Sequence, residues 1–395
     1  MDKQILRIGA GAGYAGDRIP PAIELAEKGQ LDYLVFECLA ERTIALAQLE
    51  RSHNPLAGFD PLLSARMRAV LPACLRQGVR IISNMGAANP LQAGHAVLAV
   101  ARELGLKQVQ VAVVLGDDVW VTLTEQHLSL PLLESDQTLS SLQTRLVSAN
   151  AYLGAEALLP ALQTGAQVII TGRVADAALF LGPLVHGLGW KLADAATEED
   201  FNRLAQGLTV GHLLECSGQG SGGNFGSQGD WQNIPDLAHI GYPIAEVWQD
   251  GTAVITKAPD TGGLVNFDTV RQQLLYEVHN PHAYFSPDVV LDMGQIQLTD
   301  EGQHRVRLTG AQGHAPTGQL KVVAGFRDGF KAEISWGFSW PDAWDKVHAA
   351  EAMIRSQLQA RKMPFDELFV EYPGLNSAHG PLAPLPPADE LNERA

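Results

Sequence analysis

Residues 5–11 read ILRIGAG, residues 32–38 read DYLVFEC, and residues 79–84 read VRIISN. Two runs of the same kind follow, VQVAVVLG at 109–116 and QVIITG at 167–172. Each run is short, rich in Val and Ile, and largely apolar, as strands are that a sheet buries on both faces. Because helix-like segments separate the runs, we predict an α/β fold, a parallel sheet flanked by helices.

The segments between these runs have the apolar spacing of helices. They are PPAIELAEKG (20–29), RTIALAQLERS (42–52), LLSARMRAVLPACLRQG (62–78), LQAGHAVLAVARELG (91–105) and SANAYLGAEALLPALQTG (148–165). Four of the five end in Gly, the residue that commonly follows the last turn of a helix. We therefore predict a helix in each segment and a sheet that helices cover on both sides.

The second half of the chain has a different character. The pattern strand, turn, strand fits YPIAEVWQDGTAVITKA (242–258), DVVLDMGQIQLTDEGQHRVRLTGAQG (288–313) and LKVVAGFRDGFKAEISWGFSW (320–340). We therefore predict a smaller, antiparallel β-rich region of the α+β type after the parallel sheet.

These changes of character predict the domain organisation. An α/β domain spans 1–214, and a Gly-rich junction loop follows at 215–232, with six Gly in eighteen residues. The β-rich domain spans 233–375 and ends in a helix at 344–363, and a Pro-rich tail, expected to be disordered, fills 376–395.

The composition limits the classes of partner. Hydrophobic residues make up 46% of the 395 residues, enough for a large core. The 28 basic and 44 acidic residues give a net charge of −16, and such a surface repels nucleic acid and anionic membranes. The three cysteines form no disulfide or CxxC pattern, which indicates a reducing compartment. No apolar run reaches the ~18 residues of a membrane span, so we expect a cytoplasmic protein.

Ligands of open parallel sheets bind beyond the carboxyl ends of the strands, so the residues after each run are the first candidates. After the first run, residues 11–16 fit G-x-G-x-x-G, and Glu37 lies about twenty residues further on, as in a dinucleotide site. Pro20 delays the helix that would meet the pyrophosphate, and a tight turn that serves packing is the alternative. We expect no cofactor. Asp17 is a candidate acid or base, and Arg18 a candidate anion-binding residue.

The second run ends in Glu37, and Glu41 and Arg42 follow it. Paired acids beside a guanidinium group can do acid/base chemistry, with Arg42 binding an anionic group of the substrate. Capping of the next helix by Glu41, with Arg42 on the surface, is the alternative.

The third run opens into SNMGAANP (83–90). Asn84, Gly86 and Asn89, just before a helix that starts with Pro, form a candidate cradle for an anion or a carbonyl group. Side-chain capping alone is the alternative.

The fifth run leads to Arg173 and Asp176. Arg173 is placed to grip a carboxylate or phosphate, with Asp176 as a candidate acid or base, and a structural Arg173–Asp176 pair is the alternative. Asp117 and Asp118, after the fourth run, could hold a divalent cation, but a solvated turn is the preferred interpretation. The histidines form no zinc pattern, so we expect no metal site.

The Gly-rich segment offers a thiol, Cys216, with His212 one helical turn before it. This pair could make Cys216 a nucleophile, and a buried, inert cysteine is the alternative. The residues expected to line a ligand loop here are Gln219, Gly222, Gly223 and Asn224.

Taken together, the motifs resemble the acyclic terpene utilisation (AtuA) family. They are GAGAGYAGDR, DYLVFECLAERTIALAQ, SNMGAANP, TGRVADAAL, GHLLECSGQGSGGNF, IGYPIAEV, TGGLVNFDTVRQQLLYEV and PDVVLDM, in this order over about residues 4–340. The resemblance implies a place in bacterial pathways that degrade branched acyl-CoA thioesters, and it assigns no catalytic residue.

The resemblance also implies a partner. Many members continue into a small ferredoxin-like domain, and this chain stops at residue 395 without one. We therefore expect a separate small ferredoxin-like subunit to supply it, and we expect a homo-oligomer from the general frequency of such assemblies.

The polar residues at every strand end predict an enzyme that acts on a carboxylate or an acyl thioester. The resemblance implies that this substrate is a branched carboxylate or acyl-CoA thioester, in terpenoid or branched-acid degradation. The expected reaction adds or removes water or breaks a C–C bond, as a lyase does, next to a carbonyl group. The alternatives are a non-catalytic subunit that binds the acyl-CoA or its acid, and a Cys216-dependent hydrolase or acyl transferase.

Overall fold

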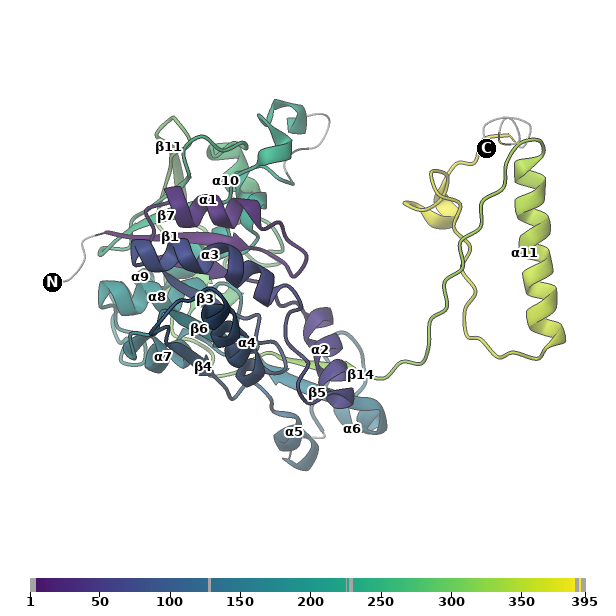
Figure 1. Cartoon of the computed structure of the whole chain (residues 1–395), viewed down its shortest axis with the longest axis horizontal. Helices are drawn as coiled ribbons and strands as arrows, with labels where there is room; N and C mark the ends of the chain where they lie inside the picture. The colour runs from purple at the N-terminus through teal and green to yellow at the C-terminus, as the bar shows by residue number, and fades with distance from the viewer. Residues whose placement is uncertain (1–4, 127–128, 225, 227–229, 388–390, 392–395) are drawn as a thin grey trace. The chain divides into compact units, whose positions relative to one another are not determined.

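A nine-stranded mixed sheet forms the centre of the fold (Figure 1). The structure is a computed structural model that describes residues 5–126, 129–224, 226, 230–387 and 391. Five of the strands are parallel, in the order β1-β2-β3-β6-β4. They are β1 (Ile5–Ala12), β2 (Tyr33–Phe36), β3 (Arg80–Ser83), β4 (Val111–Val114) and β6 (Val168–Thr171). The five strands expected from the apolar runs are therefore confirmed.

Helices cover both faces of this sheet. One face packs on α1 (Pro20–Lys28), α3 (Leu63–Gln77) and α4 (Pro90–Glu103), and the other on α7 (Leu159–Gln163), α8 (Ala178–Leu188) and α9 (Glu198–Leu214). Along β2, Leu34 and Phe36 belong to the first of these cores and Val35 to the second. A strand buried on both faces needs apolar residues at consecutive positions, which is why the runs do not alternate with polar residues.

Four antiparallel strands continue the same sheet beyond β1, in the order β11-β12-β8-β7-β1. They are β7 (Pro243–Trp248), β8 (Ala253–Lys257), β11 (Gln297–Asp300) and β12 (Val306–Thr309). The hairpin β7–β8 turns at Asp250 and Gly251, as the sequence predicts. Both sides of the predicted boundary at residue 214 thus share one sheet, and the division into two domains there stays a prediction.

Two smaller sheets complete the strand set. β13 (Gln312–His314), β10 (Val290–Asp292) and β9 (Tyr284–Phe285) form one, and β14 (Val322–Phe326) pairs with β5 (Leu146–Ala151) in the other. Both are antiparallel. A parallel sheet flanked by helices, with additional antiparallel strands, confirms the predicted α/β class.

Short helices connect these strands. The α-helices are α2 (Glu41–His53), α5 (Trp120–Gln126), α6 (Leu139–Leu142) and α10 (Phe267–Leu274). The 3-10 turns are Gln143–Arg145, Ala155–Leu158, Ser217–Ser221, Asp230–Asn233, Leu237–His239 and Gly380–Leu382.

Two local predictions are wrong. The segment 148–165 was expected to be one helix, but its first residues form the end of β5, and it becomes helical only from the 3-10 turn Ala155–Leu158 through α7. The reason is tertiary: β5 pairs with β14, for example Ala151 with Val322, and a partner so far along the chain leaves no local signal. In the segment 320–340, the first half forms β14, but the second half, expected to be a strand, has no assigned strand.

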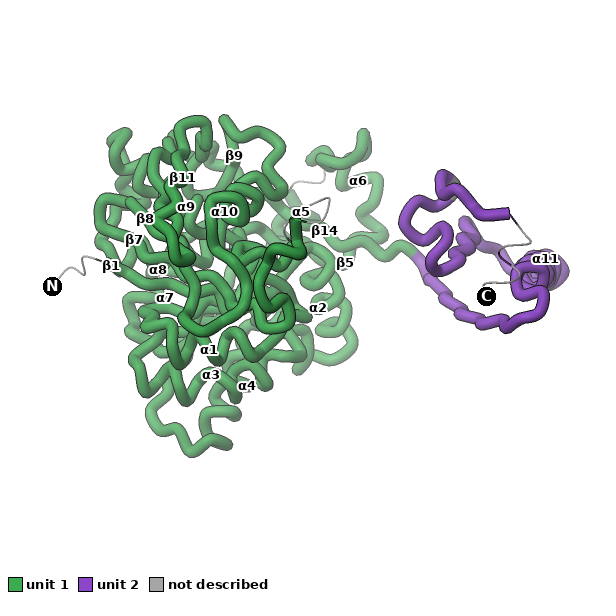
Figure 2. The backbone as a smooth tube through the Cα atoms, turned by 90° about the horizontal axis from the view of Figure 1, so that it is seen from above, with its two compact units in different colours: residues 1–328 green, residues 329–395 purple. Residues whose placement is uncertain are grey.

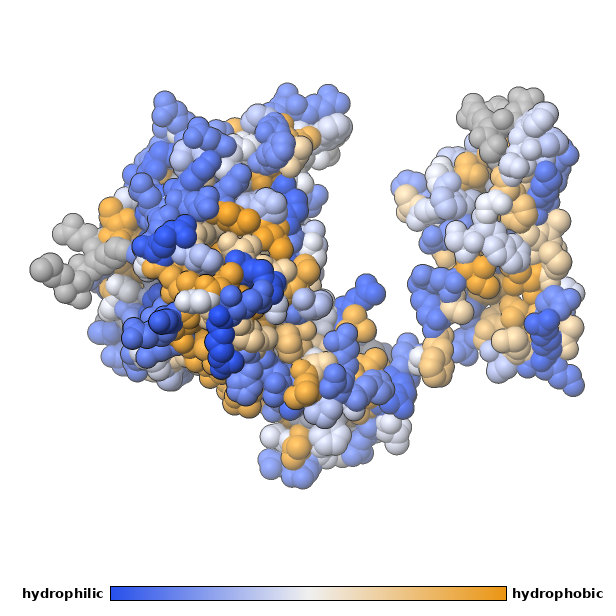
Figure 3. Space-filling model, viewed as in Figure 1, coloured by the Kyte–Doolittle hydropathy of each residue, from blue (hydrophilic) through white to orange (hydrophobic). Residues whose placement is uncertain are grey.

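The chain divides into two compact units, residues 1–328 and 329–395 (Figure 2). The second unit contains α11 (Ala343–Ala360) and exposes large apolar side chains, among them Ile334, Trp336 and Trp340. Orange and beige atoms mark apolar surface on this unit in Figure 3. Of the predicted tail, residues 388–390 and 392–395 lie outside the described residues. Among the residues that the structure describes, no helix is both long and apolar enough to cross a bilayer.

Candidate functional site

A cavity of about 1410 Å³ opens at the carboxyl ends of β1, β2 and β6. The C-terminal end of α9, the turn at 217–221, residues 276–287 and the start of β14 also contribute to its wall. Of the predicted site residues, the cavity is lined by Asp17, Arg18, Glu37, Glu41, Asp176, Cys216, Gln219, Gly223 and Asn224. The others, Arg42, Asn84, Gly86, Asn89, Arg173 and Gly222, do not line it. Residues from distant parts of the sequence thus meet at the edge where the fold predicts a ligand site.

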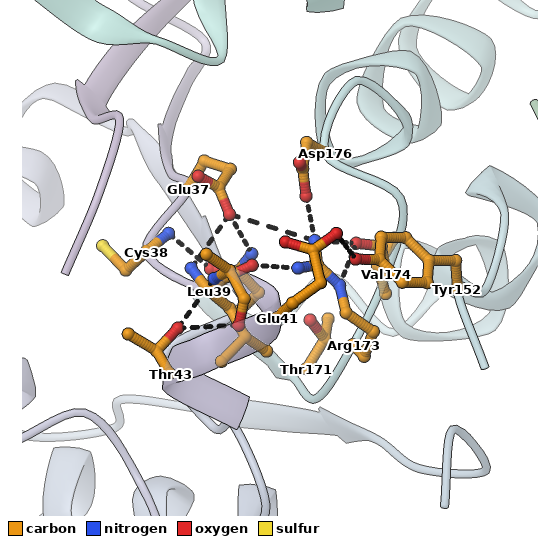
Figure 4. Close-up of polar contacts among 12 residues, drawn as sticks. Glu37, Cys38, Leu39, Glu41, Thr43, Tyr152, Thr171, Arg173, Val174 and Asp176 are labelled. Atoms are coloured by element: carbon orange, nitrogen blue, oxygen red, sulfur yellow. Dashed lines mark hydrogen bonds and ion pairs between the residues drawn. The ribbon is translucent and has the colours of Figure 1, made fainter. Parts of the chain in front are cut away.

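Arg173 is the buried cation behind this wall, with no exposed side-chain surface (Figure 4). Its side chain donates to the backbone oxygens of Leu39 and Val174, with 3.0 Å from Nε to the latter, and it forms an ion pair with Asp176. Its Nη2 atom also lies 3.9 Å from Glu37 Oε1. Burial lowers the pKa of Arg173, but the charges of Asp176 and Glu37 outweigh this effect and raise it. Arg173 therefore stays charged and is committed to contacts within the protein.

Glu37 follows β2 and lies at the cavity wall, nearly buried. Its Oε1 atom accepts hydrogen bonds from the backbone N of Leu39 (2.9 Å) and from Nδ2 of Asn84 (2.7 Å). Burial and the charge of Asp176 raise the pKa of Glu37 well above its usual value, although Arg173 and both hydrogen bonds act in the opposite direction. Glu37 is thus held in place from behind by Asn84 and retains a proton more readily than an exposed glutamate.

Asp176 is the second carboxyl group at Arg173, and 41% of its side chain remains exposed at the cavity. Loss of water around the carboxyl group raises its pKa, and Arg173 lowers it by a smaller amount. One guanidinium group cannot neutralise two carboxylates in a site of low polarity, so the pair binds a proton at higher pH than isolated carboxyl groups do. Of the two sequence interpretations of Arg173, the contacts favour the structural pair with Asp176 over an anion-binding residue. In this pair, Arg173 also shifts the pKa of both Glu37 and Asp176.

Glu41, at the first turn of α2, forms a separate group at the rim. Its Oε1 atom accepts hydrogen bonds from the hydroxyl of Tyr152 (2.6 Å) and from Nζ of Lys321 (3.0 Å). Partial burial raises the pKa of Glu41, but these two donors and the charge of Lys321 outweigh burial and bring it to about 2. Glu41 is therefore ionised at neutral pH, and its pKa is shifted in the opposite direction from those of Glu37 and Asp176.

Asp17 closes the loop after β1 onto the Gly-rich turn. Its carboxylate accepts hydrogen bonds from the backbone N of Gly13 (2.9 Å), the hydroxyl of Ser217 (2.6 Å) and the hydroxyl of Tyr242. Gly13 is required here, because a Cβ atom at this position would lie 2.5 Å from the backbone carbon of Cys216. The two Gly-rich motifs of the sequence are therefore packed against each other at the cavity.

This packing accounts for the G-x-G-x-x-G pattern. Arg66, a fully buried residue of α3, donates to the backbone oxygens of Ala15 (2.9 Å) and Asp17 (3.1 Å) and so holds the loop from behind. α1 begins only at Pro20, after the loop has turned, so its N-terminus does not follow the third Gly directly. The contacts thus favour a packing turn over a dinucleotide loop. The guanidinium of Arg18 donates to the backbone oxygens of Ala238 and Ile240.

His212 and Glu215 form a buried pair at the end of α9, and both line the cavity. His212 Nδ1 lies 3.0 Å from Glu215 Oε1, and His212 Nε2 lies 3.2 Å from the backbone oxygen of Leu274. Burial lowers the pKa of His212, but Glu215 outweighs it and raises the pKa, whereas burial raises that of Glu215 despite His212. The pair therefore holds a proton between its two members.

Cys216 lies beside this pair but is not activated by it. Both ring nitrogens of His212 face other groups, Glu215 and Leu274, rather than the thiol. Burial and the charge of Glu215 raise the pKa of the Cys216 thiol, which disfavours the reactive thiolate. The contacts around Cys216 give no support to a nucleophilic role.

The remaining predicted residues serve the surrounding structure. Asn89 donates to the backbone oxygens of Pro55 (2.9 Å) and Ala57 (2.8 Å), and Gly86 packs against the backbone of Thr171. The backbone N atoms of Gly222 and Gly223 donate to carbonyl oxygens of their own turn. Arg42 is exposed, outside the cavity.

Asp117, one of the two candidate cation ligands, is buried and accepts hydrogen bonds from Asn150 and from the backbone of Arg173, both at 2.9 Å. It supports the loop that carries Arg173. Within the described ranges, no group of three or more His, Cys, Asp or Glu side chains is arranged to hold a metal ion.

Several cavity residues were not predicted. Tyr152, Tyr242, Tyr284 and Lys321 line it, and Glu215 contributes a carboxyl group that the sequence analysis did not select. A spacing of three residues between His212 and Glu215 near a helix end is a local signal that could have identified this pair. Tyr152 and Lys321 come together only because β5 pairs with β14, so no local signal exists for them.

The fold and this site define an α/β protein with a large, carboxyl-rich cavity at the C-terminal edge of its parallel strands. The carboxyl residues that line it are Asp17, Glu37, Glu41, Glu134, Asp176, Glu215 and Glu277, with Arg18 and Lys321 as the cationic ones.

The sequence model of the acyclic terpene utilisation family, AtuA, matches residues 6–393, and the chain belongs to this family. Membership implies a role in the use of acyclic terpenes. A search of the curated proteins gave no match, and a search of the solved structures gave none.

Proposed function

We propose that this chain is an enzyme of acyclic terpene breakdown that adds water to, or removes water from, a branched acyl thioester next to its carbonyl group. The observation that carries the proposal is the pair Glu37–Asp176. Both carboxyl groups contact the single cation Arg173, both border the cavity, and both have a raised pKa.

This pair suits the chemistry because removal of water needs one base and one acid. The ionised carboxyl group takes the proton from the carbon next to the carbonyl group. The protonated one gives its proton to the hydroxyl on the following carbon, whose bond to carbon breaks as water leaves. The pair as a whole ends with the proton it started with, and addition of water follows the same path in reverse.

The charge of the cavity favours a thioester over a free acid. Among the residues that the structure describes, seven carboxyl residues and two Arg or Lys residues line the wall, so a substrate carboxylate would meet repulsion. The acyl part of a thioester is uncharged, and its carbonyl group replaces the carboxylate. A volume of about 1410 Å³ also leaves room for a long, branched chain.

The test is turnover of 3-methylbut-2-enoyl-CoA and longer branched enoyl thioesters, followed by loss of the enoyl thioester absorbance. We expect Glu37→Gln and Asp176→Asn each to lower kcat by about 10²–10⁴-fold. The same change at an exposed residue outside the cavity, Glu199→Gln, should leave turnover unchanged.

Wild-type activity in both carboxyl variants would contradict the proposal. A thioester that binds without turnover would favour the non-catalytic subunit instead. The small ferredoxin-like partner and the homo-oligomer expected from the sequence stay predictions, and a mass measurement on the purified protein checks both.

A further inference from the structure

Glu215 is a carboxyl group whose position has a structural cost. It is 9% exposed and follows the last residue of α9, where the helix dipole disfavours a negative charge. Its Oε1 atom contacts His212, but its buried Oε2 atom has no hydrogen-bond partner among the residues that the structure describes. A buried polar atom without a partner costs free energy and needs an explanation other than folding.

The contacts of His212 determine what Oε2 can do. The backbone oxygen of Leu274 can only accept a hydrogen bond, so Nε2 of His212 carries a hydrogen. The proton of the pair then lies between Nδ1 and Glu215 Oε1, whichever of these two atoms binds it. In both cases Oε2 carries no hydrogen. Oε2 is therefore an acceptor that requires an O–H or N–H group from a ligand.

Gln219, which also lines the cavity, supplies a hydrogen-bond donor, whereas Glu215 supplies an acceptor. Its Oε1 atom faces the amide of Asn224, with 3.4 Å between Asn224 Nδ2 and Oε1. This contact directs the amide nitrogen of Gln219 away from Asn224, and that buried nitrogen has no partner within the described part of the chain. Gln219 and Glu215 both line the cavity, so one unpartnered donor and one unpartnered acceptor belong to the same wall.

We propose that Glu215 and Gln219 form a subsite for a 3-hydroxyacyl group, in which Glu215 accepts the hydroxyl hydrogen and Gln219 donates to the carbonyl oxygen. A hydroxyl group two carbons from a carbonyl group supplies this donor and acceptor within one short fragment. The inference rests on the proposed function and narrows it. Of the two thioesters that the reaction interconverts, the 3-hydroxyacyl thioester is the one that binds more tightly.

The position of Asp176 agrees with this assignment. Asp176 and Glu215 are close enough for the charge of one to raise the pKa of the other. A fragment bound at Glu215 and Gln219 thus lies in the same cavity as the Glu37–Asp176 pair. His212 acts as a positioning residue that fixes the carboxyl group of Glu215.

The test is calorimetric binding of two thioesters that differ by one hydroxyl group, 3-hydroxy-3-methylbutanoyl-CoA and 3-methylbutanoyl-CoA. We expect the full-length protein to bind the hydroxylated thioester at least tenfold more tightly, as a hydrogen bond to a buried, otherwise unpartnered acceptor implies. Glu215→Leu, which removes the acceptor, should abolish this preference while the variant still binds the second thioester. Glu199→Leu, the same change on α9 outside the cavity, should keep the preference.

Gln219→Leu is the second variant, because a change at the buried Glu215 could unfold the protein. It should weaken binding of both thioesters by a similar factor, since both contain the carbonyl group. Equal affinity of the wild type for the two thioesters, or a preference that survives Glu215→Leu, overturns the subsite and leaves the proposed function standing. If the wild type binds neither thioester, the proposed function fails, and the subsite fails with it.

Discussion

Arg173 holds two carboxyl groups, Glu37 and Asp176, at the wall of one cavity, and its single charge is shared between them. Its donors are engaged by protein oxygens, so it cannot also grip a substrate anion without breaking buried contacts. Its effect is electrostatic, because its charge limits the rise in the pKa of both acids. At the scale of single residues, the reactivity of the site therefore depends on a group that does not touch the cavity.

Asp288 gives a residue-scale prediction about stability and pH. Burial raises its pKa to about 7, although its Oδ1 atom accepts a hydrogen bond from the backbone N of Ala155 (2.8 Å). The unfolded chain ionises near the ordinary value of 3.8, so the folded state binds the proton more tightly. The stability that Asp288 contributes is complete below that value and is lost as the pH rises toward about 7.

We therefore expect Asp288→Asn, which cannot ionise, to remove this loss. Between about pH 5 and about pH 7, the free energy of unfolding of the wild type should fall by about 2 kcal/mol more than that of the variant. Urea unfolding at both pH values measures the difference, with the exposed Asp268→Asn as the control. Parallel pH profiles for the wild type and Asp288→Asn would show that Asp288 is not neutral in the fold.

The site residues differ in how far the sequence could predict them. Glu37 and Asp176 were predicted because each follows a buried strand. The carboxyl ends of parallel strands lie at one edge of the sheet, where ligands bind. Arg173 was predicted for the same reason, but whether it faces a ligand or the protein depends on side-chain packing that spacing does not describe. Glu215 was passed over in favour of its neighbour Cys216, because sequence shows the thiol but not its burial.

At the scale of elements, α9 covers one face of the sheet and also positions His212 and, directly after its last residue, Glu215 at the cavity. It can do both because it crosses α8 closely. A Cβ atom at Gly211 would fall against the backbone oxygen of Ala177, well inside van der Waals contact. Ala177 follows Asp176 directly, so the same crossing also sets the position of one acid of the Glu37–Asp176 pair.

We expect Gly211→Ala to destabilise the protein by about 1–3 kcal/mol, although Ala favours helices, because the obstacle is backbone and cannot rotate away. Gly207→Ala on the same helix is the control, since its Cβ would meet side-chain ends of Leu181 and Trp190, both at 2.8 Å. Urea unfolding of the two variants provides the comparison. An equal or larger loss in Gly207→Ala would contradict the role given to the crossing.

Local pattern was sufficient for elements that neighbours in sequence define. The five parallel strands and the hairpin β7–β8 have their apolar pattern, length and turn residues within short windows. β5 and β14 do not: each becomes a strand because it pairs with the other across the chain, and 148–165 therefore reads as a helix. The part of the site that depends on this pairing, Tyr152 and Lys321 beside Glu41, was for that reason beyond local prediction.

At the scale of the whole molecule, the cavity belongs to one of the two compact units. Its lining residues fall between residues 13 and 321, and residues 1–328 form a unit with their own core. If the cavity is where the chemistry occurs, binding and turnover should not depend on residues 329–395.

We therefore expect a fragment of residues 1–328 to unfold cooperatively and to bind branched acyl thioesters with an affinity within about twofold of the full chain, since no cavity contact is removed. Thermal unfolding and calorimetric titration measure both properties. A protease site placed between residues 328 and 329 gives a second version, in which the full chain folds before it is cut. Loss of thioester binding in the cut protein, with its melting transition intact, would show that residues 329–395 complete the site, and the cavity described by residues 13–321 would then be only part of it.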